Sequence, residues 1–196
     1  TMLVDLAAFE YNLSQCCHTA LKHGKQLRIA TKSVRVPYLL EHALKFCQTF
    51  QNSQHPNLCA GLMCFSLLEA NFISKLEWYN RLLGSSSSVS SAPPALLVAY
   101  PLVLRKCSQE AQVLIVMVVH RSIDICLMVD CIEHVQAIEQ VFSDYYSSSP
   151  NAQQAKRCKV CIDMDVSFKT PIIHFGVHRS PIRSELDFQR LFNYLT

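Results

Sequence analysis

The sequence has few glycines and little net charge, and each shortage excludes a class of function. Only four glycines occur in 196 residues, so neither a G-x-G-x-x-G loop nor a P-loop can be built to hold phosphate. The net charge is +3, with Lys and Arg scattered, which gives no support for a nucleic-acid partner. No apolar run reaches the length of about 18 residues that indicates a membrane span, and no signal peptide is found. We therefore expect a cytoplasmic protein with no nucleic-acid or membrane partner.

Cysteine, by contrast, is abundant, but its spacing is not that of a disulfide framework. Ten cysteines occur, most of them in apolar runs where a free thiol behaves as a small hydrophobic group. Cys16 and Cys17 are adjacent and the other spacings are irregular, which favours a reducing compartment. Cys158 and Cys161 form a C-x-x-C pair, but zinc needs two further ligands, and residues three apart in a strand point to opposite faces. We therefore expect no metal site at this pair.

The composition is that of a globular domain with a large core. Hydrophobic residues make up 50% of the chain and charged residues 17%, too few charges for a disordered protein. The length predicts one domain over 1–196, or part of a larger one. The Ser- and Pro-rich stretch 84–94 is predicted to be a flexible insertion within that domain, because the strand pattern resumes directly after it. Since Thr1 precedes Met2, we expect the native N-terminus to be longer.

Apolar runs and helical periodicities alternate along the chain. The runs predict strands at 3–6, 28–31, 58–65, 96–100, 125–129 and 160–166. Apolar residues at helical spacing predict helices at 9–21, 37–47, 66–76, 102–120, 132–141 and 181–195. The apolar run 113–119 also fits part of a strand, and both alternatives stay open there. Polar, turn-rich stretches at 52–57 and 145–154 are predicted to be loops.

Three kinds of residue mark where the predicted helices begin. Asp5 and Asp130 each precede a helical periodicity, and an aspartate in that place is a good N-cap. Ser66 and Glu69 have the spacing of a capping box. Pro37 fits the first turn of a helix, where its missing N–H is no loss.

The order of these elements predicts the fold class. Strands that alternate with helices at intervals of about 30 residues are typical of βαβ units on a parallel sheet. The strands are continuous apolar runs, as expected when both faces of the sheet are buried. A barrel and an open doubly wound sheet both fit this pattern. A complete barrel takes about 250 residues, so a barrel here would lack its last strands.

The stretch 27–37 carries the most informative single residue, Lys32. It follows a predicted strand, and ligands of α/β proteins bind at the carboxyl ends of strands. Apolar surroundings and the nearby cations Arg28 and Arg35 would disfavour the charged form of Lys32 and make it a better amine nucleophile toward an aldehyde. The alternative is a solvated lysine in a basic loop.

Residues 31–37 read Thr-Lys-Ser-Val-Arg-Val-Pro, and further motifs lie at 3–12, 61–70, 97–101, 129–135, 161–165 and 175–181. Together they resemble, in collinear order, the alanine-racemase-type barrel domain that binds pyridoxal 5′-phosphate (PLP). The lysine motif is similar to that of the D-threonine aldolase and D-serine dehydratase branch. It shares the Thr-Lys-Ser-x-Arg string of a subgroup labelled amino-acid deaminase or aldolase.

The resemblance implies a PLP-dependent lyase, or a piece of one, that acts on a small D-amino acid by aldol cleavage or deamination. Lys32 would be the catalytic residue that forms a Schiff base with PLP. The other implied cofactor contacts are Arg35, Tyr100, Asp165, His174 and Arg179. His174 stands where the aldolase relatives have an arginine against the cofactor ring, so His174 or Arg179 would take that role.

For some of these residues, the position along the chain indicates a role without reference to the resemblance. Tyr100 ends a predicted strand on the side where ligands bind, but a buried tyrosine can also serve packing alone. Asp163 and Asp165 would share one face of a strand, with Asp165 nearer its exit. The alternative for Asp165 is a structural cap in a loop.

In the enzymes that the chain resembles, the phosphate-binding loops, the ligands of a divalent metal and further catalytic groups lie in later strands and a second domain. None of those motifs occurs here. We therefore expect a partial TIM-type (β/α) barrel that lacks its last strands and the C-terminal domain, and a homodimer at full length. The alternatives are a non-catalytic PLP-binding protein, an amino-acid racemase, and a flavodoxin-like binding module without PLP.

Overall fold

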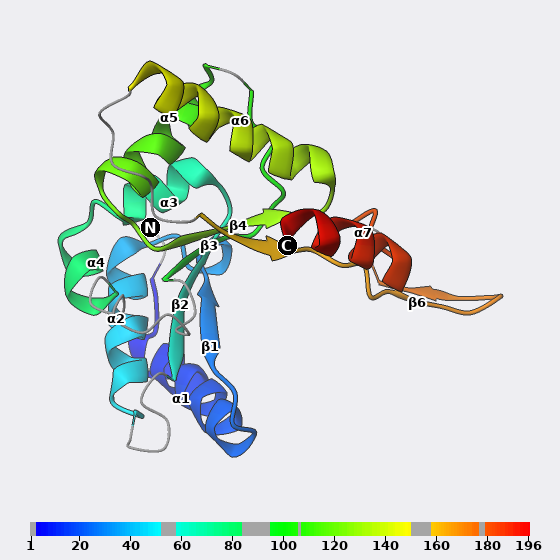
Figure 1. The fold of residues 1–196 in the computed structure, drawn as a ribbon. Helices are drawn as coiled ribbons and strands as arrows, with labels where there is room; N and C mark the ends of the chain where they lie inside the picture. Colours follow the sequence, from blue (N-terminus) through cyan, green and yellow to red (C-terminus); the bar gives the residue numbers. More distant parts are fainter. Residues whose placement is uncertain (1–2, 52–57, 84–94, 106, 150–157, 177–178) are drawn as a thin grey trace. The chain divides into compact units, whose positions relative to one another are not determined.

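The computed structural model describes residues 3–51, 58–83, 95–105, 107–149, 158–176 and 179–196 (Figure 1). The strands of its main sheet are β1 (Leu27–Ala30), β2 (Cys59–Cys64), β3 (Leu96–Val98), β4 (Ile125–Val129) and β5 (Lys159–Ile162). They are parallel and follow one another in sequential order, and helices connect them, so the fold is α/β as expected. The features expected at 52–57 and 84–94 lie outside the described residues.

The chain divides into two compact units. The first comprises Thr1–Leu97 with Ile123–Ile125, and the second comprises Val98–Ser122 with Cys126–Thr196. None of the helices in the described ranges combines the length and the apolarity that crossing a membrane requires.

The first unit begins with helix α1 (Leu6–Lys22). The Asp5 carboxylate accepts a hydrogen bond from the Ala8 N–H at 3.0 Å and caps α1, as expected. The strand predicted at 3–6 is wrong, because this cap starts the helix at Leu6 and leaves 3–5 without regular structure. Gly24 follows the end of α1 with a φ of +59°, which glycine adopts without steric cost.

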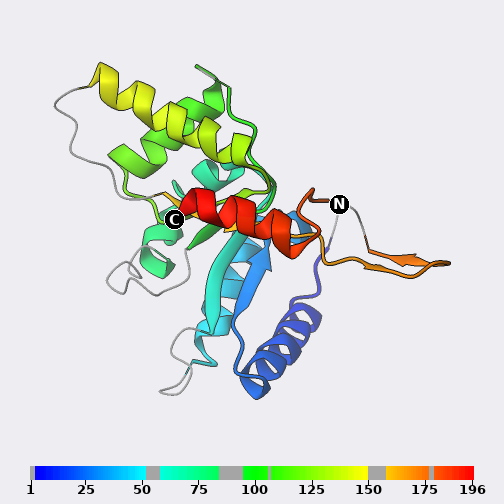
Figure 2. The same cartoon turned by 45° about the vertical axis from the view of Figure 1, so that its right-hand side comes forward.

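Strand β1 leads through a short 3-10 turn, η1 (Thr31–Ser33), to helix α2 (Pro37–Gln48). Pro37 occupies the first turn of α2, as its missing N–H predicts. Helices α1 and α2 pack together beside β1 and β2 (Figures 1 and 2). The buried cluster at this contact consists of Cys17, Ala20, Cys47 and Leu58. The periodicity of apolar residues therefore predicted the buried faces of both helices.

Two short helices, α3 (Leu67–Ile73) and α4 (Glu77–Leu82), follow β2 in place of the single helix expected at 66–76. The Ser66 hydroxyl accepts a hydrogen bond from the Glu69 N–H at 3.2 Å and caps α3, as the capping-box spacing predicts. The Ser74 hydroxyl donates to the Asn71 carbonyl at 2.8 Å, a local bond that competes with the helical hydrogen bonds where α3 ends.

Gly61 in β2 lies where two backbones approach closely. Its φ is +104°, and a Cβ at this position would lie 2.2 Å from the Ala95 carbonyl oxygen. The Leu62 N–H donates to that same oxygen at 2.9 Å. Only a residue without a side chain fits this contact, so Gly61 is required by the fold.

In the second unit, helix α5 (Gln109–Ile115) continues into a π-helical turn, η3 (Val116–His120). The Ser108 hydroxyl caps α5 by accepting a hydrogen bond from the Ala111 N–H at 3.1 Å. The run 113–119, for which the sequence allowed either a helix or a strand, is therefore helical. Its buried residues Leu114, Met117 and Val118 recur at helical spacing.

Strand β4 has the bounds that its apolar run predicts, and helix α6 (Ile132–Ser148) follows it. Asp130 was expected to cap α6, but this prediction is wrong: the N-cap is Cys131, and the Asp130 carboxylate lies against the His134 ring. The loop predicted to begin at residue 145 is also wrong over 145–148, which are helical. The Tyr145 ring in this segment lies edge to face against both the Tyr146 ring and the His120 ring.

Strand β5 ends at Ile162, so the strand expected at 160–166 is too long. Asp165 turns the chain: its carboxylate accepts a hydrogen bond from the Ser167 N–H at 2.9 Å, and its own N–H donates to the Ile182 carbonyl at 2.8 Å. Strands β6 (Phe168–Lys169) and β7 (His174–Phe175) then form an antiparallel hairpin. The hairpin projects from the helices of its own unit in both views (Figures 1 and 2).

Helix α7 (Glu185–Leu195) begins later than the predicted residue 181, because Ser184 is its N-cap. The Ser184 hydroxyl and the Asp187 carboxylate form a capping box. The Ser184 hydroxyl and the backbone N–H of Arg183 lower the pKa of Asp187 below its usual range. The stabilising effect of this carboxylate is therefore present above the ordinary pKa of an aspartate and is lost as the pH falls through the lowered value.

Replacing Ser184 with alanine is expected to lower the free energy of unfolding by about 1 kcal/mol, the usual effect of losing an N-cap side chain. Urea unfolding followed by circular dichroism measures this change. Asn193→Ala, on the exposed part of the same helix, is the matched control and is expected to cause no loss. Equal destabilisation by both substitutions would contradict the capping role.

Candidate functional site

Lys32 lies in the turn η1, directly after the carboxyl end of β1, where the sequence predicted it. The preceding residue, Thr31, is fully buried and its hydroxyl donates to the Met63 carbonyl in β2 at 3.1 Å. This bond fixes the turn to the sheet. The Lys32 side chain is exposed, and within the described part of the chain its amine has no hydrogen bond or ion pair. A fixed backbone that carries an uncommitted amine is suited to covalent attachment of an aldehyde.

The two arginines near Lys32 have different surroundings. Arg28 in β1 donates from Nη1 to the Leu62 carbonyl at 3.2 Å, so its guanidinium is held against β2. Arg35 follows η1 and is exposed. Of the two, Arg35 is the cation that an anionic ligand at this turn could reach from solvent.

The other four predicted cofactor contacts belong to the second unit. Tyr100 follows β3 and is 39% exposed. His174 in β7 and Arg179 are exposed. The Asp165 side chain is only 2% exposed and lies 3.5 Å from Arg183 Nε, in addition to its bond with the Ser167 N–H. Asp165 therefore already serves as a loop cap and ion-pair partner within its unit.

Asp163 follows β5, and three charged groups act on it. Burial raises the pKa of the Asp163 carboxyl, the negative charges of Asp130 and Asp165 raise it further, and the Arg179 guanidinium opposes these effects. Asp163, Asp130 and Arg179 thus share one electrostatic environment at the carboxyl ends of β4 and β5. The sequence placed the two aspartates at strand ends but did not show that they influence each other.

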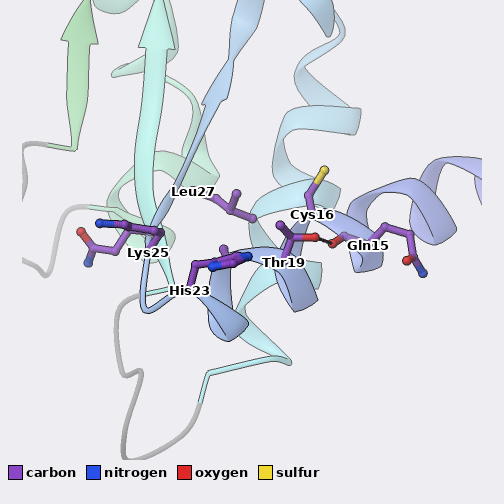
Figure 3. A pocket seen from close by; sticks show the side chains of 8 residues that line it. Gln15, Cys16, Thr19, His23, Lys25 and Leu27 are labelled. Atoms are coloured by element: carbon purple, nitrogen blue, oxygen red, sulfur yellow. Dashed lines mark hydrogen bonds between the residues drawn. The ribbon is translucent and has the colours of Figure 1, made fainter.

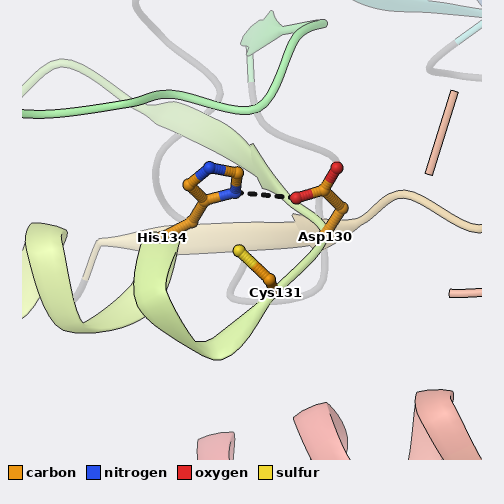
Figure 4. A group of neighbouring side chains, drawn as sticks. All are labelled: Asp130, Cys131 and His134. Carbon is orange, nitrogen blue, oxygen red and sulfur yellow. Dashed lines mark ion pairs between the residues drawn. The ribbon is translucent and has the colours of Figure 1, made fainter. Parts of the chain in front are cut away.

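A group of three metal-ligating side chains lies at the junction of β4 and α6 (Figure 4). One ligand atom each from Asp130, Cys131 and His134 lies within 4.8 Å of the other two. Sequence reasoning missed this group, because it assigned Asp130 to capping and considered only Cys158 and Cys161 as metal ligands. The signal that could have found it is the spacing D-C-x-x-H at a strand-to-helix junction, since residues four apart share a helix face.

A concave surface lies beside α1 and the start of β1 (Figure 3). It has a volume of about 640 Å³ and is lined by Gln15, Cys16, Thr19, Ala20, His23, Lys25, Gln26 and Leu27. Its lining is mostly apolar, and the Thr19 hydroxyl is occupied by a bond to the Gln15 carbonyl at 2.8 Å. None of the residues predicted for cofactor binding lines it, so it is not the predicted site.

Three cysteines form a thiol cluster in the first unit. Cys17 Sγ in α1 lies 3.7 Å from Cys47 Sγ in α2. The hydrogen bond from the Cys47 thiol lowers the pKa of Cys59, whereas burial opposes this and the nearby Arg28 charge assists it. The cluster is part of the core between α1, α2 and β2.

The sequence matches no protein-family model, no curated protein and no solved structure. The assignment of a function therefore depends on the residues themselves and on the motifs that resemble the PLP-dependent barrels.

Proposed function

We propose that this chain is the lysine-bearing part of a PLP-dependent lyase that acts on a small D-amino acid, with Lys32 as the residue that holds the cofactor. The observation that carries the proposal is the placement of Lys32. It lies on a backbone-anchored turn at the carboxyl end of a parallel strand, and its exposed amine has no partner within the described ranges. This is where α/β enzymes bind ligands.

The strand order supports a partial (β/α) barrel over the doubly wound alternative. Strands β1 to β5 follow one another without a change of direction in the order. A flavodoxin-like sheet has a reversal between neighbouring strands, and its ligand binds at that switch point. Sequential order is the order of a barrel, so it favours the PLP-binding reading over a flavodoxin-like module.

The residues at the turn η1 fit a PLP group. Lys32 provides the amine for its aldehyde, and Arg35 provides an exposed cation for its phosphate. Tyr100, His174 and Arg179, which the resemblance also implies as cofactor contacts, belong to the second unit and are exposed there. Asp165 fits least, since its carboxylate is already engaged by Arg183 and the Ser167 N–H.

The chain's own contribution to the reaction is attachment and proton transfer. PLP, when bound, supplies an electron sink for the bond that breaks at the substrate Cα. Lys32 would hold the cofactor through Nζ. When its amine is free, Lys32 would be a base able to accept a proton at Nζ. The bond from the Thr31 hydroxyl to the Met63 carbonyl holds the backbone of this turn at the carboxyl end of β1.

The experiment that tests the proposed activity is turnover by the PLP-loaded full-length protein that contains this chain. We expect ammonia and pyruvate from D-serine, or glycine and acetaldehyde from D-threonine, with the L-enantiomers as matched controls. Formation of L-serine from D-serine would instead support a racemase. Bound PLP with no product from any substrate would support a non-catalytic PLP-binding protein and contradict the lyase.

A further inference from the structure

The junction of β4 and α6 brings three different ligand atoms together on one short segment. Asp130 directly follows β4, Cys131 is the N-cap of α6, and His134 lies in the first turn of α6. Figure 4 shows the His134 ring facing the Asp130 carboxylate, with the sulfur of Cys131 beside the pair. An oxygen, a nitrogen and a sulfur ligand thus point into the same small space within the second unit.

The contact between Asp130 and His134 does not satisfy the histidine. His134 Nδ1 lies 2.7 Å from Asp130 Oδ1, and the two side chains are only 17% and 10% exposed. Although this distance is that of an ion pair, Nδ1 is buried and has no partner with the geometry of a hydrogen bond. A buried nitrogen without a hydrogen bond is costly. A cation between the nitrogen and the carboxylate would remove this cost.

The charges around the group also favour a cation. Asp130 and Asp163 are both acidic and influence each other at the ends of β4 and β5, and Arg179 compensates only part of this charge. Burial raises the pKa of the Cys131 thiol, and the carboxylates of Glu133 and Asp130 raise it further, so a metal ion would displace this proton and bind the sulfur as the thiolate. A divalent ion bound to that thiolate and to Asp130 would therefore meet two negative ligands.

We propose that Asp130, Cys131 and His134 bind one zinc ion, with the fourth coordination position open to water. Zinc takes this mixture of oxygen, nitrogen and sulfur ligands at about 2.0–2.3 Å in a tetrahedral arrangement. Such bonds place ligand atoms about 3.3–3.6 Å apart, within the 4.8 Å envelope of the three atoms. Oδ1 and Nδ1, now 2.7 Å apart, would separate by less than about 1 Å. The site is independent of Lys32 and of the proposed PLP chemistry.

Zinc titration of the chelator-treated, full 196-residue chain under reducing conditions tests this site. Calorimetry is expected to give one zinc per chain, and cobalt in place of zinc is expected to give thiolate-to-metal charge-transfer absorption. His134→Gln and Cys131→Ser should each weaken binding more than about 100-fold, since loss even of a partner that only orients a ligand costs about 10–100-fold.

The controls separate this site from other thiols and imidazoles. Cys158→Ser removes the C-x-x-C pair, and His120→Gln removes an exposed imidazole of the same unit. Both variants are expected to bind zinc as the unmodified chain does. Loss of binding in Cys158→Ser but not in Cys131→Ser would overturn the proposal, as would the absence of any stoichiometric binding.

Thermal unfolding provides a second measurement, which still tests the site if His134→Gln fails to fold. Zinc at about 100 times its dissociation constant should raise the Tm of the unmodified chain by about 5–10 °C. The isosteric Cys131→Ser variant should have the same Tm without zinc and gain no such rise. An equal rise in both proteins would show that zinc binds elsewhere and would overturn the proposal.

Discussion

Lys32→Ala is expected to lose the visible absorbance of bound PLP and to retain less than about a tenth of the cofactor after dialysis. The physical reason is that alanine has no amine to form the covalent bond to the cofactor aldehyde. Because the Lys32 side chain is exposed and unpaired within the described residues, its removal should change the free energy of unfolding by no more than about 0.5 kcal/mol. Absorbance spectra and the PLP content after dialysis measure the effect.

Two control variants make this result specific. Lys32→Arg keeps the positive charge but not the nucleophilic amine, so it should lose the cofactor as Lys32→Ala does. Lys22→Ala removes another exposed lysine of the same unit, at the end of α1, and should retain PLP fully. Unchanged absorbance in both Lys32 variants would place the attachment point at another residue.

Gly61→Ala is expected to destabilise the protein by about 2–6 kcal/mol, which is a large part of the stability of an ordinary domain. A non-glycine residue held at an unfavourable backbone conformation costs about 1–3 kcal/mol, and overpacking costs about 1–3 kcal/mol more. Both effects apply, because the φ of Gly61 is +104° and the added Cβ would lie 2.2 Å from the Ala95 carbonyl oxygen. That oxygen cannot move freely, since it accepts a hydrogen bond from the Leu62 N–H.

Gly24→Ala is the matched control for this prediction. Gly24 also has a positive φ, +59°, but nothing lies within 4 Å of the position that a Cβ would take. Its replacement should therefore cost only about 1–2 kcal/mol, the price of the left-handed conformation. Urea unfolding of both variants measures the difference. Equal destabilisation would mean that the contact between Gly61 and Ala95 does not constrain the fold.

The sequence predicted those parts of the fold that depend on local chemistry. The apolar run of β4, the proline at the start of α2 and the caps at Asp5 and Ser66 each act through neighbouring residues, so their effect is readable without tertiary structure. The predicted element bounds are wrong where a side chain had several local hydrogen-bond partners within reach. The strand predicted to reach residue 166 ends at Ile162, and Asp165 instead bonds to the Ser167 N–H in the turn that follows.

The candidate sites also differ in whether the local sequence is enough to predict them. Lys32 could be placed because a strand, a basic turn and a proline define its position along the chain. The ligand group at β4 and α6 was missed because an aspartate at position 130 suits both an N-cap and a metal ligand. Only the structure shows that the N-cap is Cys131. The influence of Asp130 on Asp163 depends on two strands 30 residues apart, which no local pattern reveals.

The central claim, covalent attachment of PLP to Lys32, is tested most directly by borohydride reduction of the PLP-loaded chain followed by peptide mapping. Reduction makes the bond between the cofactor and its amine permanent, so the modified residue is identified by mass. The predicted result is a single pyridoxyl group on the peptide that contains Lys32. A label on other lysines alone, or no label at all, would contradict the claim.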